Sequence, residues 1–157
     1  MKRLPVIAGI VAIAAVVALC WHWMPARQVR LHQRDFLRAI EDRDWPRVSG
    51  FIAPDFQDAL GHNRETVMST LPDAFRDFLA CGLLAEETAI GRENRNLILF
   101  EKIRVVGSGG PIAQYMMSES ERLTQPFAFS WRQASWKPWH WELVSVAQPE
   151  LTRSEER

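Results

Sequence analysis

The clearest pattern of apolar and polar positions lies near the C-terminal end of the chain, over residues 127–146. Phe127, Phe129 and Trp131 alternate with smaller or polar residues, and a period of two is typical of a strand with one apolar face. A polar break at residues 133–135 separates this run from a second one. The stretch therefore predicts a hairpin of two strands. Since it holds four of the seven tryptophans, we expect it to supply much of the core.

The second run divides its side chains between the two faces of a strand. Trp139, Trp141 and Leu143 share one face, and His140 and Glu142 share the other. If the second face lines a pocket, His140 and Glu142 could act as an acid/base pair, because imidazole titrates near neutral pH. If it faces solvent, they are ordinary polar residues at a sheet edge. The sequence identifies no third group that would complete a catalytic set.

The remainder of the chain changes from helical to strand-like periodicity at about Leu79. Apolar residues at helical spacing predict three helices, over residues 29–43, 44–53 and 63–78, with Asp44 and Asn63 as the N-caps of the second and third. We expect Pro72 to kink the third helix or to restart it behind a Thr70 cap. Alternation predicts three further strands, over residues 79–90, 97–106 and 112–123. Helices followed by antiparallel strands predict an α+β domain with the helices on one face of a sheet.

The N-terminal stretch differs from the rest in composition. In residues 4–24, His22 is the only strongly polar residue, and about 20 apolar residues are enough to cross a bilayer core. Trp21 and Trp23 lie at the far end of this stretch, where tryptophan is enriched at membrane interfaces. The pattern therefore predicts one transmembrane helix.

Two alternatives to an uncleaved anchor are a cleaved signal peptide and a lipoprotein. No convincing cleavage site precedes Trp21, and Leu19 stands before Cys20, where lipoproteins have a small residue. We divide the chain into a signal-anchor (1–27), a domain (28–148) and a charged tail (149–157). Basic residues flank the span on both sides, but a short basic N-terminus is typical of a signal-anchor. It favours a single-pass protein with an extracytoplasmic, periplasmic domain.

Charge and cysteine content exclude several classes of function. The chain has 19 basic and 19 acidic residues, and residues 1–27 hold three of the basic ones and no acidic one. The rest is therefore acidic, which argues against binding to nucleic acid. Cys81 is alone in the domain and is more simply a small buried residue than a nucleophile. His62, near Asp55 and Asp58, matches no metal-ligand spacing, so we expect no metal and no cofactor.

Two segments after the first predicted helix resemble the opening of NTF2-like domains. Residues 41–48 read EDRDWPRV and residues 51–56 read FIAPDF. Members of that superfamily often begin with a helix and a loose D-W/L-x-x-l…F-x-x-d-F segment, and end in tryptophan-rich paired strands. The resemblance covers about residues 29–148. It implies a cone, in which a curved antiparallel sheet wraps around helices and leaves a pocket at the open end, often with dimerisation through the outer sheet face.

The resemblance constrains function less than fold, because the superfamily includes isomerases, dehydratases, hydrolases, binders and adaptors. Its isomerases use a buried carboxylate and an oxyanion hole that contains a tyrosine. The single tyrosine here, Tyr115, lies in a predicted strand and not in the first helix, so those residues are not carried over. We expect a membrane-anchored, non-catalytic binding or protein-interaction module, in a homodimer, in a membrane complex or with a small apolar ligand. The alternative is an enzyme that uses the cone pocket.

Aromatic residues are the candidates for lining that pocket or an interface. They are Tyr115, Phe127, Phe129, Trp131, Trp139 and Trp141. The simpler interpretation is that most of them form the core, with a subset available for a dimer interface. Among the charged residues of the strands, we expect Glu101 and Arg104 to lie on the exposed face of the sheet.

Overall fold

The structure, a computed structural model, describes residues 10–16, 19 and 24–151. Its elements from residue 25 onward are α2 (Pro25–Glu41), α3 (Trp45–Phe51), α4 (Arg64–Arg76), β1 (Phe78–Glu93), β2 (Asn96–Gly109), α5 (Pro111–Arg122), β3 (Phe127–Gln133) and β4 (Trp141–Ala147). The four strands form one antiparallel sheet in the order β1-β2-β3-β4. The predicted α+β class, with helices before the sheet, is confirmed.

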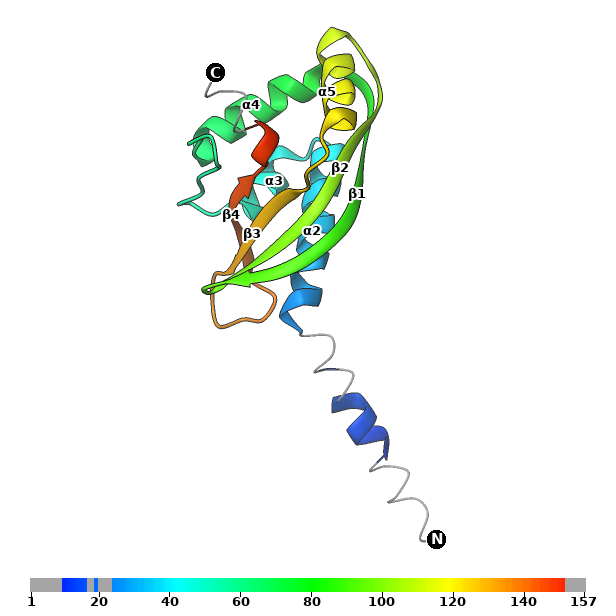
Figure 1. Cartoon of the computed structure of the whole chain (residues 1–157). Helices are drawn as coiled ribbons and strands as arrows, with labels where there is room; N and C mark the ends of the chain where they lie inside the picture. The colour runs from blue at the N-terminus through cyan, green and yellow to red at the C-terminus, as the bar shows by residue number, and fades with distance from the viewer. Residues whose placement is uncertain (1–9, 17–18, 20–23, 152–157) are drawn as a thin grey trace.

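The sheet curves around α2, which lies along its concave face (Figure 1). The long β1–β2 hairpin pairs from Phe78↔Gly109 to Glu93↔Asn96, and its register shifts near Ala80 and again between Glu87 and Ala89. Such irregularities bend a strand and increase its twist. The curved sheet contacts α2 through β1, β2 and β4, and α3 through β4.

Helix α2 follows the predicted apolar stripe but begins earlier, at Pro25. Val29, Phe36, Leu37 and Ile40 are all buried, so this stripe is the face that packs on the sheet. Pro25 suits the first turn because the amide that proline lacks would have no partner there.

The next two helices have the predicted caps. The Asp44 carboxylate accepts a hydrogen bond from the Arg47 amide at the start of α3, and the Asn63 side chain accepts one from the Thr66 amide at the start of α4. Helix α4 continues through Pro72 to Arg76, so of the two alternatives, a kink or a restart, the restart is wrong. The Thr70 hydroxyl bonds back to the carbonyl of Thr66, and it therefore does not cap a new helix.

The C-terminal hairpin supplies the centre of the core, as predicted. Phe129, Trp131, Trp141 and Leu143 are each at most 5% exposed. A parallel bridge from Ile52, just after α3, to Leu143 attaches the helical part to the last strand.

The predicted strand over residues 112–123 is wrong, because this segment forms α5. Asp77, which lies just before β1, accepts hydrogen bonds from the amides of Ile112 (2.8 Å) and Ala113 (3.0 Å) and so caps the helix from a distant part of the chain. Gly110 makes this approach possible, because a Cβ there would collide with the Asp77 carboxylate. Pro111 occupies the first turn of α5.

No helix within residues 10–16, 19 and 24–151 is long and apolar enough to cross a membrane. Most of the predicted span at residues 4–24 lies outside the described residues, so the anchor stays a prediction. The predicted boundary at residue 27 falls inside α2.

Replacing the distant cap should weaken α5. Asp77→Ala removes the acceptor for two helix amides, and we expect it to lower the free energy of unfolding by about 1 kcal/mol, up to about 2. Asp77→Asn keeps a side-chain oxygen and should retain most of that stability. Urea denaturation followed by circular dichroism measures both. An Asp77→Ala variant as stable as the wild type would show that the cap does not hold α5.

Candidate functional site

An apolar pocket of about 320 Å³ lies at one end of the domain. Its walls come from the C-terminal half of α2, from residues 52–60, from α4 and from the inner face of the sheet. Sheet side chains that line it include Leu83, Ile103, Val105, Phe127, Phe129 and Val146. Facing them across the pocket are Val67 and Leu71 of α4. Residues far apart in sequence therefore build one hydrocarbon-lined space.

Asp58 and Gln148 are the two polar residues in the pocket lining, and both direct polar atoms to other partners. The Asp58 carboxylate accepts hydrogen bonds from the amides of Leu60 (2.9 Å) and His62 (2.7 Å), and lies 2.8 Å from the His62 ring nitrogen Nδ1. The Gln148 side chain donates to the carbonyl of Gln125 and accepts from the amide of Glu150. The pocket therefore offers an entering group mainly apolar contact.

His140 and Glu142 lie near each other, as predicted, but they do not line this pocket. His140 precedes β4, is half exposed, and places Nε2 3.7 Å from the Glu142 carboxylate. Its other ring nitrogen lies 3.0 Å from the Ser135 hydroxyl. The structure thus places the pair at the surface beside the β3–β4 loop, which matches the solvent-facing alternative.

The six predicted aromatic residues divide into three groups. Phe127 and Phe129 line the pocket, with their rings stacked at a centroid distance of 6.1 Å. Trp131 and Trp141 are buried in the core. Tyr115 (66% exposed) and Trp139 (51% exposed) lie at the surface. Tyr115 is on α5 and not in a strand, because Asp77 and Pro111 start a helix there.

The predicted absence of a metal ligand set involves His62, Asp55 and Asp58. Asp58 pairs with His62, whereas Asp55 forms a two-point ion pair with Arg132 at 2.7 and 2.8 Å. This hydrogen bonding lowers the pKa of Asp55. Within the part of the chain that the structure describes, no group of three or more His, Cys, Asp or Glu residues could hold a metal ion. Burial raises the pKa of the Cys81 thiol, which disfavours the reactive thiolate.

We expected Glu101 on the exposed face of the sheet, and that prediction is wrong. Glu101 lies on the inner face of β2 in line with Leu99 and Ile103, and is 8% exposed. Gln33 of α2 donates a hydrogen bond to its carboxylate (2.7 Å) and accepts one from the Trp131 indole (3.1 Å). Burial raises the pKa of Glu101, and the hydrogen bond from Gln33 opposes part of that rise. The sequence does contain a pattern that predicts this burial, because the alternation along β2 puts Glu101 on the same face as the apolar Leu99 and Ile103.

No family model and no curated protein matches the sequence. The structure is similar to that of Bd1075 from Bdellovibrio bacteriovorus, with a TM-score of 0.57 and 11% identity over 76% of this chain and 38% of the other. This chain therefore spans well under half the length of that protein.

Two further similar structures belong to proteins closer to this chain in length. One is a candidate dehydratase of the NTF2-like family from Streptomyces avermitilis, with a TM-score of 0.57 and 13% identity over 78% of this chain and 93% of the other. The second is an NTF2-like protein from Cytophaga hutchinsonii, with a TM-score of 0.53 and 16% identity over 79% and 97%. At such identities the likeness concerns the fold, and this chain has an NTF2-like α+β fold.

Proposed function

We propose that this protein is a membrane-anchored, non-catalytic binding module whose pocket takes an apolar group. The observation that carries the proposal is the pocket lining, which is apolar apart from Asp58 and Gln148. Burial of apolar surface contributes about 25 cal/mol per Å², so a hydrocarbon or aromatic group gains free energy there without needing a polar partner. The polar residues that usually orient a reacting substrate are engaged elsewhere.

The chemical class of the ligand follows from the same lining. An anionic group would meet no Lys, Arg or His among the lining residues that the structure describes. A cationic group would meet Asp58, but that carboxylate is already bonded to the Leu60 and His62 amides and to the His62 ring, and burying an unpaired charge is costly. A compact aromatic or branched hydrocarbon group fits this environment. Such a group could belong to a small molecule or to an apolar side chain of a partner protein.

An enzyme that uses the cone is the second candidate. Glu101 favours it, because this carboxyl lies on the pocket-bearing face of the sheet, next along that face to Ile103, with a raised pKa. The likeness to a candidate dehydratase supports it at the level of the fold. Against it, Glu101 does not line the pocket and its carboxylate is bonded to Gln33. These contacts fit a structural role better.

Photolabelling of the full chain in lipid vesicles tests the binding proposal. The apolar probe 3-(trifluoromethyl)-3-phenyldiazirine should label peptides that contain Leu71, Ile103 and Phe127, and mass spectrometry separates these from labelled peptides of residues 4–24. Ala59→Phe, an exposed residue at the pocket, should block entry and lower that labelling about tenfold, as a loss of ~1.4 kcal/mol in binding would.

The matched control is Ala89→Phe, an exposed position on β1 away from the pocket. It should leave labelling of the pocket peptides unchanged. Equal labelling of these peptides in both variants, or none in the wild type, would contradict the proposal.

The structural role of Glu101 gives a pH-dependent prediction. Because its folded-state pKa is raised above the ordinary 4.5, the folded protein binds more protons than the unfolded chain between the two pKa values. Stability from this group therefore falls as pH rises through that window. Glu101→Gln should remove the fall, so the variant gains stability over the wild type toward higher pH.

Urea denaturation between about pH 5 and 8 measures this difference. Glu121→Gln, an exposed site on α5, is the control and should run parallel to the wild type. If the free energy of unfolding of Glu101→Gln also runs parallel to that of the wild type across this pH range, the raised folded-state pKa of Glu101 is refuted.

A further inference from the structure

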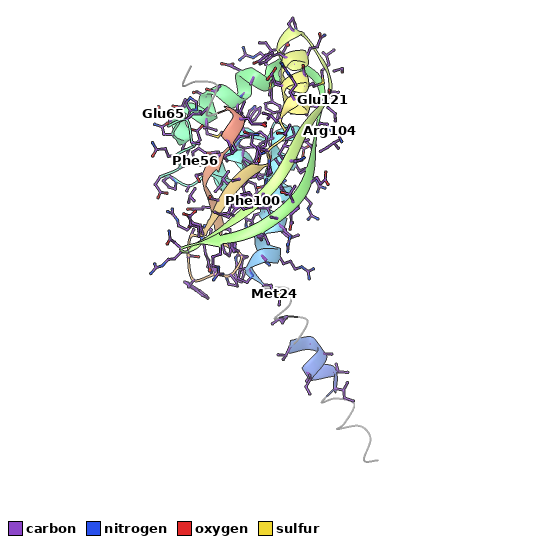
Figure 2. The ribbon with its side chains drawn as sticks, in the orientation of Figure 1. Met24, Phe56, Glu65, Phe100, Arg104 and Glu121 are labelled. Carbon is purple, nitrogen blue, oxygen red and sulfur yellow. The ribbon has the colours of Figure 1, made fainter. Side chains whose placement is uncertain are left out.

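The end of the domain opposite the pocket is formed by three segments. The start of α2, the turn between β1 and β2, and the loop between β3 and β4 meet there (Figure 1). Pro25, Arg95 and Trp136 come from these segments, and together with Arg132 of β3 they line one depression. Figure 2 shows Met24 at this end and Glu65, of the helix that walls the pocket, at the other.

Trp136 is the most exposed tryptophan among the described residues, at 84%. Trp139, in the same β3–β4 loop, is 51% exposed. Exposing large indole rings to water is unfavourable, whereas at a membrane interface the ring contacts acyl chains and its N–H reaches water or headgroups. The loop therefore presents the aromatic residue type that membrane interfaces favour.

Exposed basic residues lie on the three segments that form this end. Arg27 is in the first turn of α2, Arg92 near the end of β1, Arg95 in the β1–β2 turn, and Lys137 follows Trp136. Two acidic residues, Glu93 at the end of β1 and Glu142 beside the β3–β4 loop, offset part of this charge. Arg132 is neutralised by Asp55 and does not add to the surplus. The described domain is acidic as a whole, so this local excess of positive charge stands out and complements anionic lipid headgroups.

The chain itself brings this end to a bilayer. The predicted span ends at Met24, and α2 begins at Pro25, so no linker separates the two. A residue adds at most about 3.6 Å of reach, which leaves the start of α2 at the membrane surface if residues 4–24 cross it. The adjacent loop is then held against the headgroups.

We propose that this end of the domain is a membrane-contact surface, in which Trp136 enters the interface and Arg92, Arg95 and Lys137 bind anionic headgroups. The inference goes beyond the proposed function and rests on the predicted anchor. It orients the domain so that α4, which helps to wall the pocket, lies away from the bilayer.

Tryptophan quenching in the full chain tests this surface. The chain is reconstituted in vesicles of phosphatidylcholine and phosphatidylglycerol, with or without bromine on the acyl chains. Subtracting the emission of the Trp136→Phe variant from that of the wild type gives the emission of Trp136 alone. We expect this Trp136 emission to be lost in brominated vesicles. Wild type minus Trp45→Phe is the control. Trp45 packs against Phe75 at the pocket end, and its emission should persist in both lipids.

Charge reversal gives the second readout. Arg95→Glu combined with Lys137→Glu should restore Trp136 emission in brominated vesicles, whereas Arg76→Glu, exposed on α4, should not. If the chain floats with the vesicles but Trp136 emission is equal in both lipids, the proposed membrane-contact surface is wrong and the predicted anchor is not contradicted. A chain that fails to float contradicts both. Photolabelling of the pocket is independent of either result.

Discussion

Packing of α2 against the concave face of one curved sheet is the interaction on which the rest of the structure depends. Gln33, which is 1% exposed, joins the two by accepting a hydrogen bond from Trp131 and donating one to Glu101. A buried amide satisfied on both sides is favourable, whereas the loss of either partner would leave a desolvated polar group. This clamp fixes α2 over β2 and β3. Beyond it the face is covered by α4, and the space left there between apolar side chains is the pocket.

Local sequence patterns predicted the parts of this fold whose causes are local. The stripe of α2, the caps at Asp44 and Asn63, and the C-terminal hairpin follow from periodicity and side-chain chemistry within a few residues. Helix α5 does not, because its cap, Asp77, lies in a different element. The predicted start of the last strand is wrong for a different reason. The strand begins only at Trp141, so alternation extended back to residue 139 assigned faces to residues of a loop.

The two ends of the domain differ in the chemistry of their side chains. At the pocket end, apolar side chains line the space and the two polar lining residues, Asp58 and Gln148, are bonded to groups outside the lining or to its backbone, which suits an uncharged guest. At the other end, an indole ring and basic side chains are exposed next to the start of α2, which suits a charged interface. Glu101 lies between them as a buried carboxyl held by Gln33. This arrangement fits the binding domain that we propose, with the predicted anchor at the end away from the pocket.

The central claim is that the pocket holds an apolar guest. It is tested most directly by identifying the small molecules that co-purify with the full chain. The protein is extracted in native lipid discs without detergent, and its bound small molecules are analysed by mass spectrometry. The account predicts a stoichiometric apolar molecule, enriched over bulk lipid, that is retained by Ala89→Phe and lost from Ala59→Phe. A chain that carries no such molecule, or one that Ala59→Phe retains in full, would contradict it.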